Sequence, residues 1–178
     1  HAPRTRSLQQ ALGTYKRMCS MGVEPTEYTF RALLTSCVNA KAPEHVQGIL
    51  QEMGLRGQPL TQRSLRTALY ACRLAGDAQR ARGVLREHAN AGVAPSGTDL
   101  ALFALALVAA GEPGAAAGVM RRVLRHPDRG AEVDTEVCDA VALRLCEAGE
   151  WRDALTVVYL MRARGKAASV VVYTQLVT

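Results

Sequence analysis

The sequence predicts an all-α protein, a right-handed α-solenoid of stacked antiparallel helix pairs, and three observations carry this prediction. The segment FRALLTSCVNAK, residues 30–41, returns 35 positions later as LRTALYACRLAG, residues 65–76, and a fixed period of about 20 to 50 residues is typical of repeat architectures. Aromatic residues make up 4% of the chain and hydrophobic residues 48%, which suits close-packed helices better than sheets. Within each period, apolar residues recur at spacings of three and four, which indicates amphipathic helices.

The repeat frame divides the chain into pairs of an A helix and a following B helix. The period is 35 residues up to residue 124, grows to 38 across RHPDRGAEVD, residues 125–134, and then returns to 35. An insertion of three residues is expected in a surface loop, where added length has a small entropic cost. The frame predicts one helical-repeat domain within a longer chain, with segments 1–26 (half repeat), 27–61, 62–96, 97–134 (extended), 135–169 and 170–178 (start of a further repeat).

Start and stop signals place the helices in order along the chain. The opening B helix is expected at roughly residues 8–21 with Ser7 as its N-cap, and the last A helix from about Val170. The first full pair has its apolar positions at Phe30, Leu33, Leu34 and Cys37 on the A helix and at Val46, Ile49, Leu50 and Met53 on the B helix. Later B helices are expected to start at Pro43, after Asp77 and at Pro113. They are expected to end before a left-handed residue at Gly22, Gly57, Gly92 and Gly165.

A column of short polar residues comes directly before the A helices, at Thr26, Thr61, Ser96, Asp134 and Ser169. Each of these side chains can accept a backbone N–H of the following helix, an interaction of about 1 kcal/mol. The column is therefore expected to consist of helix N-caps, whatever else it contacts.

Composition and motifs exclude several function classes. The five cysteines include no CxxC pair, so neither a disulfide framework nor a zinc site is expected, and Cys37 and Cys72 are expected in the core. There is no apolar run of 18 residues, which speaks against a membrane span. The histidines have no metal-ligand spacing and the chain has no glycine-rich phosphate-binding motif. We therefore expect no catalytic residues, no metal, no cofactor and no enzymatic activity.

The repeat unit resembles that of the pentatricopeptide repeat family. The resemblance is carried by GVEPTEYTFRALL and SVVVYTQLV before A-helix cores, and by EAGEWRDALTVVYLMRARG across a turn from an A to a B helix, and it covers nearly the whole chain. The tetratricopeptide signature W-x2-L-G-x2-Y is not found. The resemblance implies binding of single-stranded RNA in a mitochondrion or, as the alternative, a chloroplast, with one base held per repeat.

In that family the second, fifth and last residues of each repeat hold the base. Applied to the matching positions of this sequence, the resemblance implies RNA-binding roles for two pairs, Arg31 with Thr61 and Arg66 with Ser96. It implies the same role for Arg63 at a second position, for Asp139, and for Thr174 in the last, incomplete repeat. The third repeat has Ala101 at the fifth position, which cannot hydrogen-bond a base, and the carboxylate of Asp139 repels phosphate. Contact is therefore expected mainly through backbone charge, to which guanidinium groups are suited. The alternative for Arg31 and Arg66 is a salt bridge between repeats, for instance with Glu27.

Charge is distributed unevenly along the chain. Residues 1–89 contain 13 Lys and Arg against 6 Asp and Glu, whereas residues 90–178 contain 9 against 10. A basic half is compatible with a polyanion, and also with an ordinary solvated surface. A second basic patch is expected at Arg121, Arg122, Arg125 and Arg129. The acidic stretch 132–153 is better suited to a basic protein surface.

These observations lead to one main hypothesis and two alternatives. The main hypothesis is an RNA-binding adaptor in an organellar ribonucleoprotein such as a mitochondrial ribosome or an RNA-processing complex, in contact with single-stranded or ribosomal RNA and with protein subunits. The alternatives are a protein-binding scaffold without RNA contact and a sequence-specific RNA processing or stability factor.

Overall fold

A computed structural model describes residues 2–177, with side chains from residue 6 onward, and all regular elements of this part are helices. The chain forms two compact units, residues 1–75 with 79–94, and residues 76–78 with 95–178. Unit 1 contains α1 (Ala2–Ser20), α2 (Glu27–Ala40), the 3-10 turn η1 (Pro43–His45), α3 (Val46–Leu55), α4 (Gln62–Ala75) and nearly all of α5 (Ala78–Asn90). Unit 2 contains α6 (Gly97–Ala109), α7 (Pro113–Arg125), α8 (Pro127–Glu132), α9 (Thr135–Glu147), α10 (Trp151–Ala163) and α11 (Val170–Val177).

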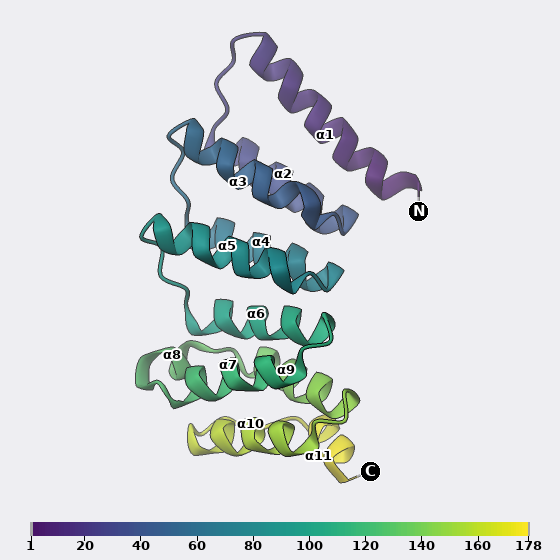
Figure 1. Ribbon diagram of the computed structural model, residues 1–178, viewed down its shortest axis with the longest axis vertical. Coiled ribbons are helices and arrows are strands. Elements are labelled where there is room, and N and C mark those ends of the chain that lie inside the picture. The colour runs from purple at the N-terminus through teal and green to yellow at the C-terminus, as the bar shows by residue number, and fades with distance from the viewer. Residues whose placement is uncertain (1, 178) are drawn as a thin grey trace. The chain divides into compact units, whose positions relative to one another are not determined.

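In unit 1 the A helices α2 and α4 pack against each other, and α2 also packs against the B helices α1 and α3 (Figure 1). The core is built from the predicted apolar positions, because Phe30, Leu34 and Cys37 of α2 and Leu50 and Met53 of α3 are at most 1% exposed. Cys72 of α4 is equally buried, so both cysteines of the repeated segment are core residues as predicted.

In unit 2 the A helices α6 and α9 pack against each other, as do the B helices α7 and α10, and each A helix packs on its own B helix. The helix α6 is apolar nearly all round, and most of its residues are buried. The predicted loop insertion is instead partly helical, since α8 occupies residues 127–132 and packs against both α6 and α7. A proline at its first turn and His126, whose Nδ1 accepts the Arg129 N–H at 3.4 Å, start this short helix.

The predicted column of N-caps is confirmed in position, because each of its five members directly precedes a helix. Thr61 and Ser96 also make reciprocal capping bonds with the third residue of their helices. The predicted stops are confirmed too, since Gly22, Gly57, Gly92 and Gly165 all have φ between 66° and 79°.

The predicted cap at Ser7 is wrong, because α1 already begins at Ala2 and Ser7 lies within it. No helix in residues 2–177 combines the length and the apolar character that spanning a bilayer requires.

Candidate functional site

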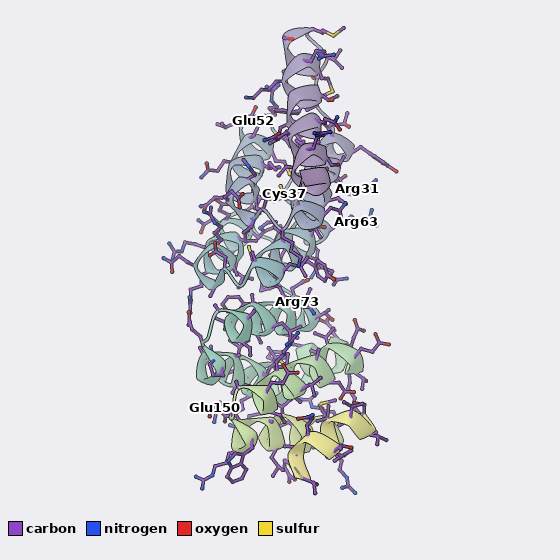
Figure 2. The ribbon with its side chains drawn as sticks, turned by 90° about the vertical axis from the view of Figure 1, so that its right-hand side faces the viewer. Arg31, Cys37, Glu52, Arg63, Arg73 and Glu150 are labelled. Carbon is purple, nitrogen blue, oxygen red and sulfur yellow. The ribbon has the colours of Figure 1, made fainter. Side chains whose placement is uncertain are left out.

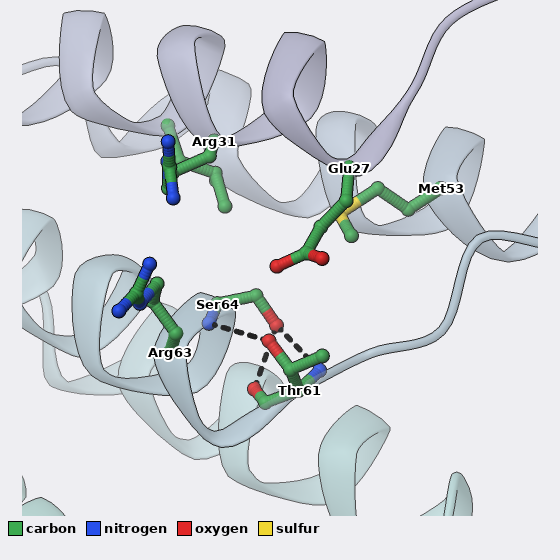
Figure 3. A pocket seen from close by; sticks show the side chains of 7 residues that line it. Glu27, Arg31, Met53, Thr61, Arg63 and Ser64 are labelled. Atoms are coloured by element: carbon green, nitrogen blue, oxygen red, sulfur yellow. Dashed lines mark hydrogen bonds between the residues drawn. The ribbon is translucent and has the colours of Figure 1, made fainter.

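Three of the predicted site residues meet in one hollow of unit 1. Arg31 comes from α2, Arg63 from the first turn of α4, and Thr61 from the position directly before α4. The hollow is completed by Glu27, Leu34, Met53 and Ser64. Figure 2 shows Arg31 and Arg63 along the same edge of the unit, away from Glu52, and Figure 3 shows both guanidinium groups on one side of the hollow.

The repeat geometry explains why these residues come together. Arg31 is the fifth residue of its repeat and Thr61 the last residue of the same repeat, which directly precedes the next A helix. Because α2 and α4 pack side by side, the first turn of α4 lies next to the first turns of α2. The structure thus brings Arg31 and Thr61 into one hollow, and their predicted role in RNA binding stays a prediction.

Thr61 is held in place by hydrogen bonds of its own. Its Oγ1 accepts the Ser64 N–H at 3.3 Å, its N–H donates to Ser64 Oγ at 3.0 Å, and the Ser64 hydroxyl lies 2.8 Å from the Thr61 carbonyl oxygen (Figure 3). Ser64 Oγ also lies 3.0 Å from Nε2 of His88, a fully buried residue of α5. Sequence reasoning missed this support, because the contact joins residues 24 positions apart on different helices.

Arg31 is held by an aromatic neighbour. Its guanidinium carbon lies 3.8 Å from the centre of the Tyr28 ring, which is 73% exposed. This geometry is a cation–π contact. Glu27 lines the same hollow as Arg31, so of the two arginines for which a salt bridge with Glu27 is the alternative, Arg31 has this carboxylate nearby and Arg66 lies outside the hollow. The site is therefore a small hollow bordered by two guanidinium groups, one of which stacks on the Tyr28 ring.

The other predicted RNA-binding residues lie outside this hollow. Arg66 is exposed on α4, one turn beyond Arg63. Ser96 caps α6, with its Oγ accepting the Asp99 N–H at 3.2 Å. Asp139 Oδ2 accepts the Ser169 N–H at 3.0 Å, and the Thr174 hydroxyl donates to the Val170 carbonyl at 2.9 Å. The side chains of Ser96, Asp139 and Thr174 thus have local structural partners, and their role in RNA binding stays a prediction.

The second basic patch is exposed at all four predicted positions, Arg121, Arg122, Arg125 and Arg129. Arg121 lies 3.9 Å from the Asp153 carboxylate of α10, a loose pair between neighbouring B helices. Arg122 and Arg125 occupy the last turn of α7, where positive charge is favourable for the helix dipole.

Several carboxylates of the acidic stretch 132–153 are engaged within unit 2. Glu132 accepts the Gly97 N–H at 3.2 Å, and Glu147 pairs with Arg144 at 2.8 Å. Asp139 and Asp153 are engaged as described above, and Asp134, Glu136 and Glu150 are exposed. The predicted protein contact through this stretch stays a prediction. The described part of the chain contains no group of three or more His, Cys, Asp or Glu residues placed to hold a metal ion.

Comparison with known proteins identifies the fold. Neither a family model nor a curated protein matches the sequence. The structure is similar to the crystal structure of the pentatricopeptide repeat protein PPR10 from maize, with a TM-score of 0.72 and 16% sequence identity across 96% of this chain. The match spans 24% of the maize chain, so the present sequence corresponds to about a quarter of that protein's length. The similarity confirms the predicted fold class and shows a pentatricopeptide-like solenoid fold.

Proposed function

We propose that this chain is an RNA-binding helical-repeat adaptor that contacts single-stranded RNA mainly through its phosphate backbone. The observation that supports this most directly is the hollow formed by Arg31, Arg63 and Thr61 in unit 1. Two guanidinium groups on one side of a hollow suit phosphate oxygens, because guanidinium makes paired hydrogen bonds to them. The exposed ring of Tyr28 adds a surface on which an unpaired base can stack.

A contact of this kind depends on charge more than on base identity. Residues 1–89 have seven more basic than acidic residues, by the counts of 13 and 6 given above, and a basic surface binds nucleic acid with salt-dependent affinity. The resemblance to organellar repeat proteins extends the proposal to a mitochondrial ribonucleoprotein, ribosomal or RNA-processing, with a chloroplast as the alternative. Import of a full-length fluorescent fusion into one of the two organelles tests this part separately.

The test is binding of a pooled single-stranded RNA to the chain at stepped salt concentrations. Removing two phosphate contacts with Arg31→Ala and Arg63→Ala together should weaken binding and reduce the slope of log affinity against log salt by about 1 to 1.5. The matched control is Arg6→Ala with Arg17→Ala, two exposed arginines of α1 in the same unit. Equal binding by the Arg31 and Arg63 variant and the parent, or equal loss in the control, contradicts the assignment to the hollow.

The scaffold alternative is favoured by a separate feature of unit 2. Trp151, Leu155 and Tyr159 lie four residues apart on α10 and are between 53% and 70% exposed. Such a stripe suits an apolar helix of a protein partner. Absence of RNA binding at low salt favours this alternative, whereas selection of one short RNA motif from the pool favours a sequence-specific factor.

A further inference from the structure

The short helix α8 covers the start of α6 within unit 2. The Thr98 hydroxyl donates to the Glu132 carbonyl at 3.0 Å, and the Gly97 N–H donates to the Glu132 carboxylate at 3.2 Å. A Cβ on Gly97 would lie 2.0 Å from the Arg129 carbonyl oxygen, so the α8 backbone rests directly on the first turn of α6. Only glycine at this position leaves room for that approach.

One residue below α8, Thr98, is among those that the repeat frame assigns to nucleotide contact. Thr98 is the second residue of the third repeat and is 8% exposed, and Ala101, the fifth, is fully buried. The second residues of the other repeats, Tyr28, Arg63, Glu136 and Val171, are all exposed. The second residue of the third repeat is therefore buried, whereas the second residues of the other repeats are exposed, and it also differs from them in residue type.

Side chains from the turn after α10 fasten α8 at both ends. Arg164 donates to the carbonyls of Pro127 and His126 at 2.7 and 2.9 Å, and Lys166 donates to the carbonyl of Ala131 at 3.0 Å and to that of Val133. The carbonyls at the C-terminal end of a short helix have no partner within the helix, and the Lys166 ammonium supplies one. The helix is thus anchored by two cations as well as by its contact with α6.

We propose that α8 fills the place that a nucleotide would take in the third repeat, so that α6 contributes no RNA contact. This inference rests on the proposed function, because it names which repeat an RNA strand cannot use. A strand reaching Thr98 would have to displace the backbone of residues 129–132, together with the hydrogen bonds of Arg164 and Lys166. Because α8 is part of the protein itself, it excludes RNA from this position whatever the RNA sequence.

The first test measures, without RNA, whether α8 shields position 98 from solvent. Thr98→Cys and its matched control Glu136→Cys place a thiol at the same repeat position in unit 2, and alkylation is followed by peptide mass spectrometry. Because thiol reactivity depends on exposure, we expect the thiol at position 98 to react at least about tenfold more slowly than that at 136. Equal rates would overturn the inference.

The second test uses the protein without substitutions, so its result does not depend on whether the Thr98→Cys variant folds correctly. Single-stranded RNA of mixed sequence containing 4-thiouridine is photocrosslinked to the chain and the crosslinked peptides are mapped. Crosslinks are expected in residues 27–35 and 61–67 and not in residues 97–105. Crosslinks in 97–105 overturn the inference about α8. Absence of crosslinks throughout, with slow alkylation at position 98, contradicts the proposed function and leaves the covered position of α6 in place.

Discussion

Ser64 Oγ lies 3.0 Å from Nε2 of His88, which joins the first turn of α4 to α5 inside unit 1. The other ring nitrogen, Nδ1, lies 2.9 Å from the Val84 carbonyl oxygen. Since a carbonyl can only accept, Nδ1 carries the proton, and Nε2 is then an acceptor that shares the single Ser64 hydroxyl proton with the Thr61 carbonyl oxygen. His88 is fully buried, so both ring nitrogens depend on these protein partners. The Ser64 hydroxyl therefore contacts both the N-cap of α4 and the buried His88 ring of unit 1.

Ser64→Ala should destabilise unit 1 by about 1 to 3 kcal/mol, because it removes the capping bonds with Thr61 and the contact of Ser64 Oγ with the buried His88 ring. Urea unfolding followed by circular dichroism measures the change. The control is Ser36→Ala, whose hydroxyl donates to the Ala32 carbonyl of its own helix, and its effect should stay within about 0.5 kcal/mol. Similar unfolding curves for the two variants would show that the bond to His88 adds nothing.

Tyr15→Phe should weaken the contact between α1 and α3. The Tyr15 hydroxyl donates to Glu52 Oε1 at 2.9 Å, and Arg56 Nε donates to the same oxygen at 2.8 Å. At neutral pH we expect a loss of about 1 kcal/mol, measured by urea unfolding, because a hydrogen bond to a charged acceptor is removed. Tyr70→Phe changes an exposed tyrosine of α4 and should leave stability unaltered.

The effect of Tyr15→Phe should also depend on pH. The bonds from Arg56 and Tyr15 lower the pKa of Glu52 below its ordinary value of 4.5, so this stabilisation is present above pH 4.5 and is lost as the pH falls through the lowered value. Burial and the bond to Glu52 raise the pKa of Tyr15 from 10.0 to about 12, so the phenol stabilises the fold below pH 10 and ceases to do so as the pH rises toward 12. The parent and variant should therefore converge at both extremes. A constant difference down to the acid limit would contradict the role of the Glu52 carboxylate.

The buried cysteines should resist alkylation in the native protein. Burial raises the pKa of Cys37 and of Cys138 to about 11, so at pH 8 only about one molecule in a thousand carries the reactive thiolate at either position. Cys19 is half-exposed and should be modified first when peptides are followed by mass spectrometry. In denaturant the rates should become similar. Native labelling of Cys37 as fast as that of Cys19 would show that unit 1 opens readily.

The repeat frame predicted the helix pairs, their N-caps and their glycine stops, because these depend on local spacing and turn chemistry. It did not predict α8, since the Pro, Asp and Gly residues of 127–130 are typical of a loop. The helix forms because tertiary partners hold it, namely Gly97 and Thr98 below and Lys166 at its end. Of the candidate site, the meeting of Arg31 with Thr61 followed from the period. The contact of Ser64 with His88 could not, because it is set by packing between helices.

Gly97→Ala tests how firmly α8 rests on α6. The added Cβ would lie 2.0 Å from the Arg129 carbonyl oxygen and 2.7 Å from Val133 Cγ2, distances that a backbone carbonyl can relieve only if α8 moves. We expect a loss of about 1 to 3 kcal/mol in stability, as for other overpacking substitutions. The displaced helix should also be cleaved faster by trypsin after Arg129, which mass spectrometry of the fragments detects.

The matched control for this variant is Gly118→Ala, in the interior of α7. No atom lies within 4 Å of the Cβ that it adds, so the change should stabilise the helix by roughly 0.5 to 1 kcal/mol through the better helix propensity of alanine. The two glycine substitutions should therefore shift stability in opposite directions. If Gly97→Ala matches the control in stability and in resistance to trypsin, α8 does not press on α6, and the third repeat is open to a nucleotide after all.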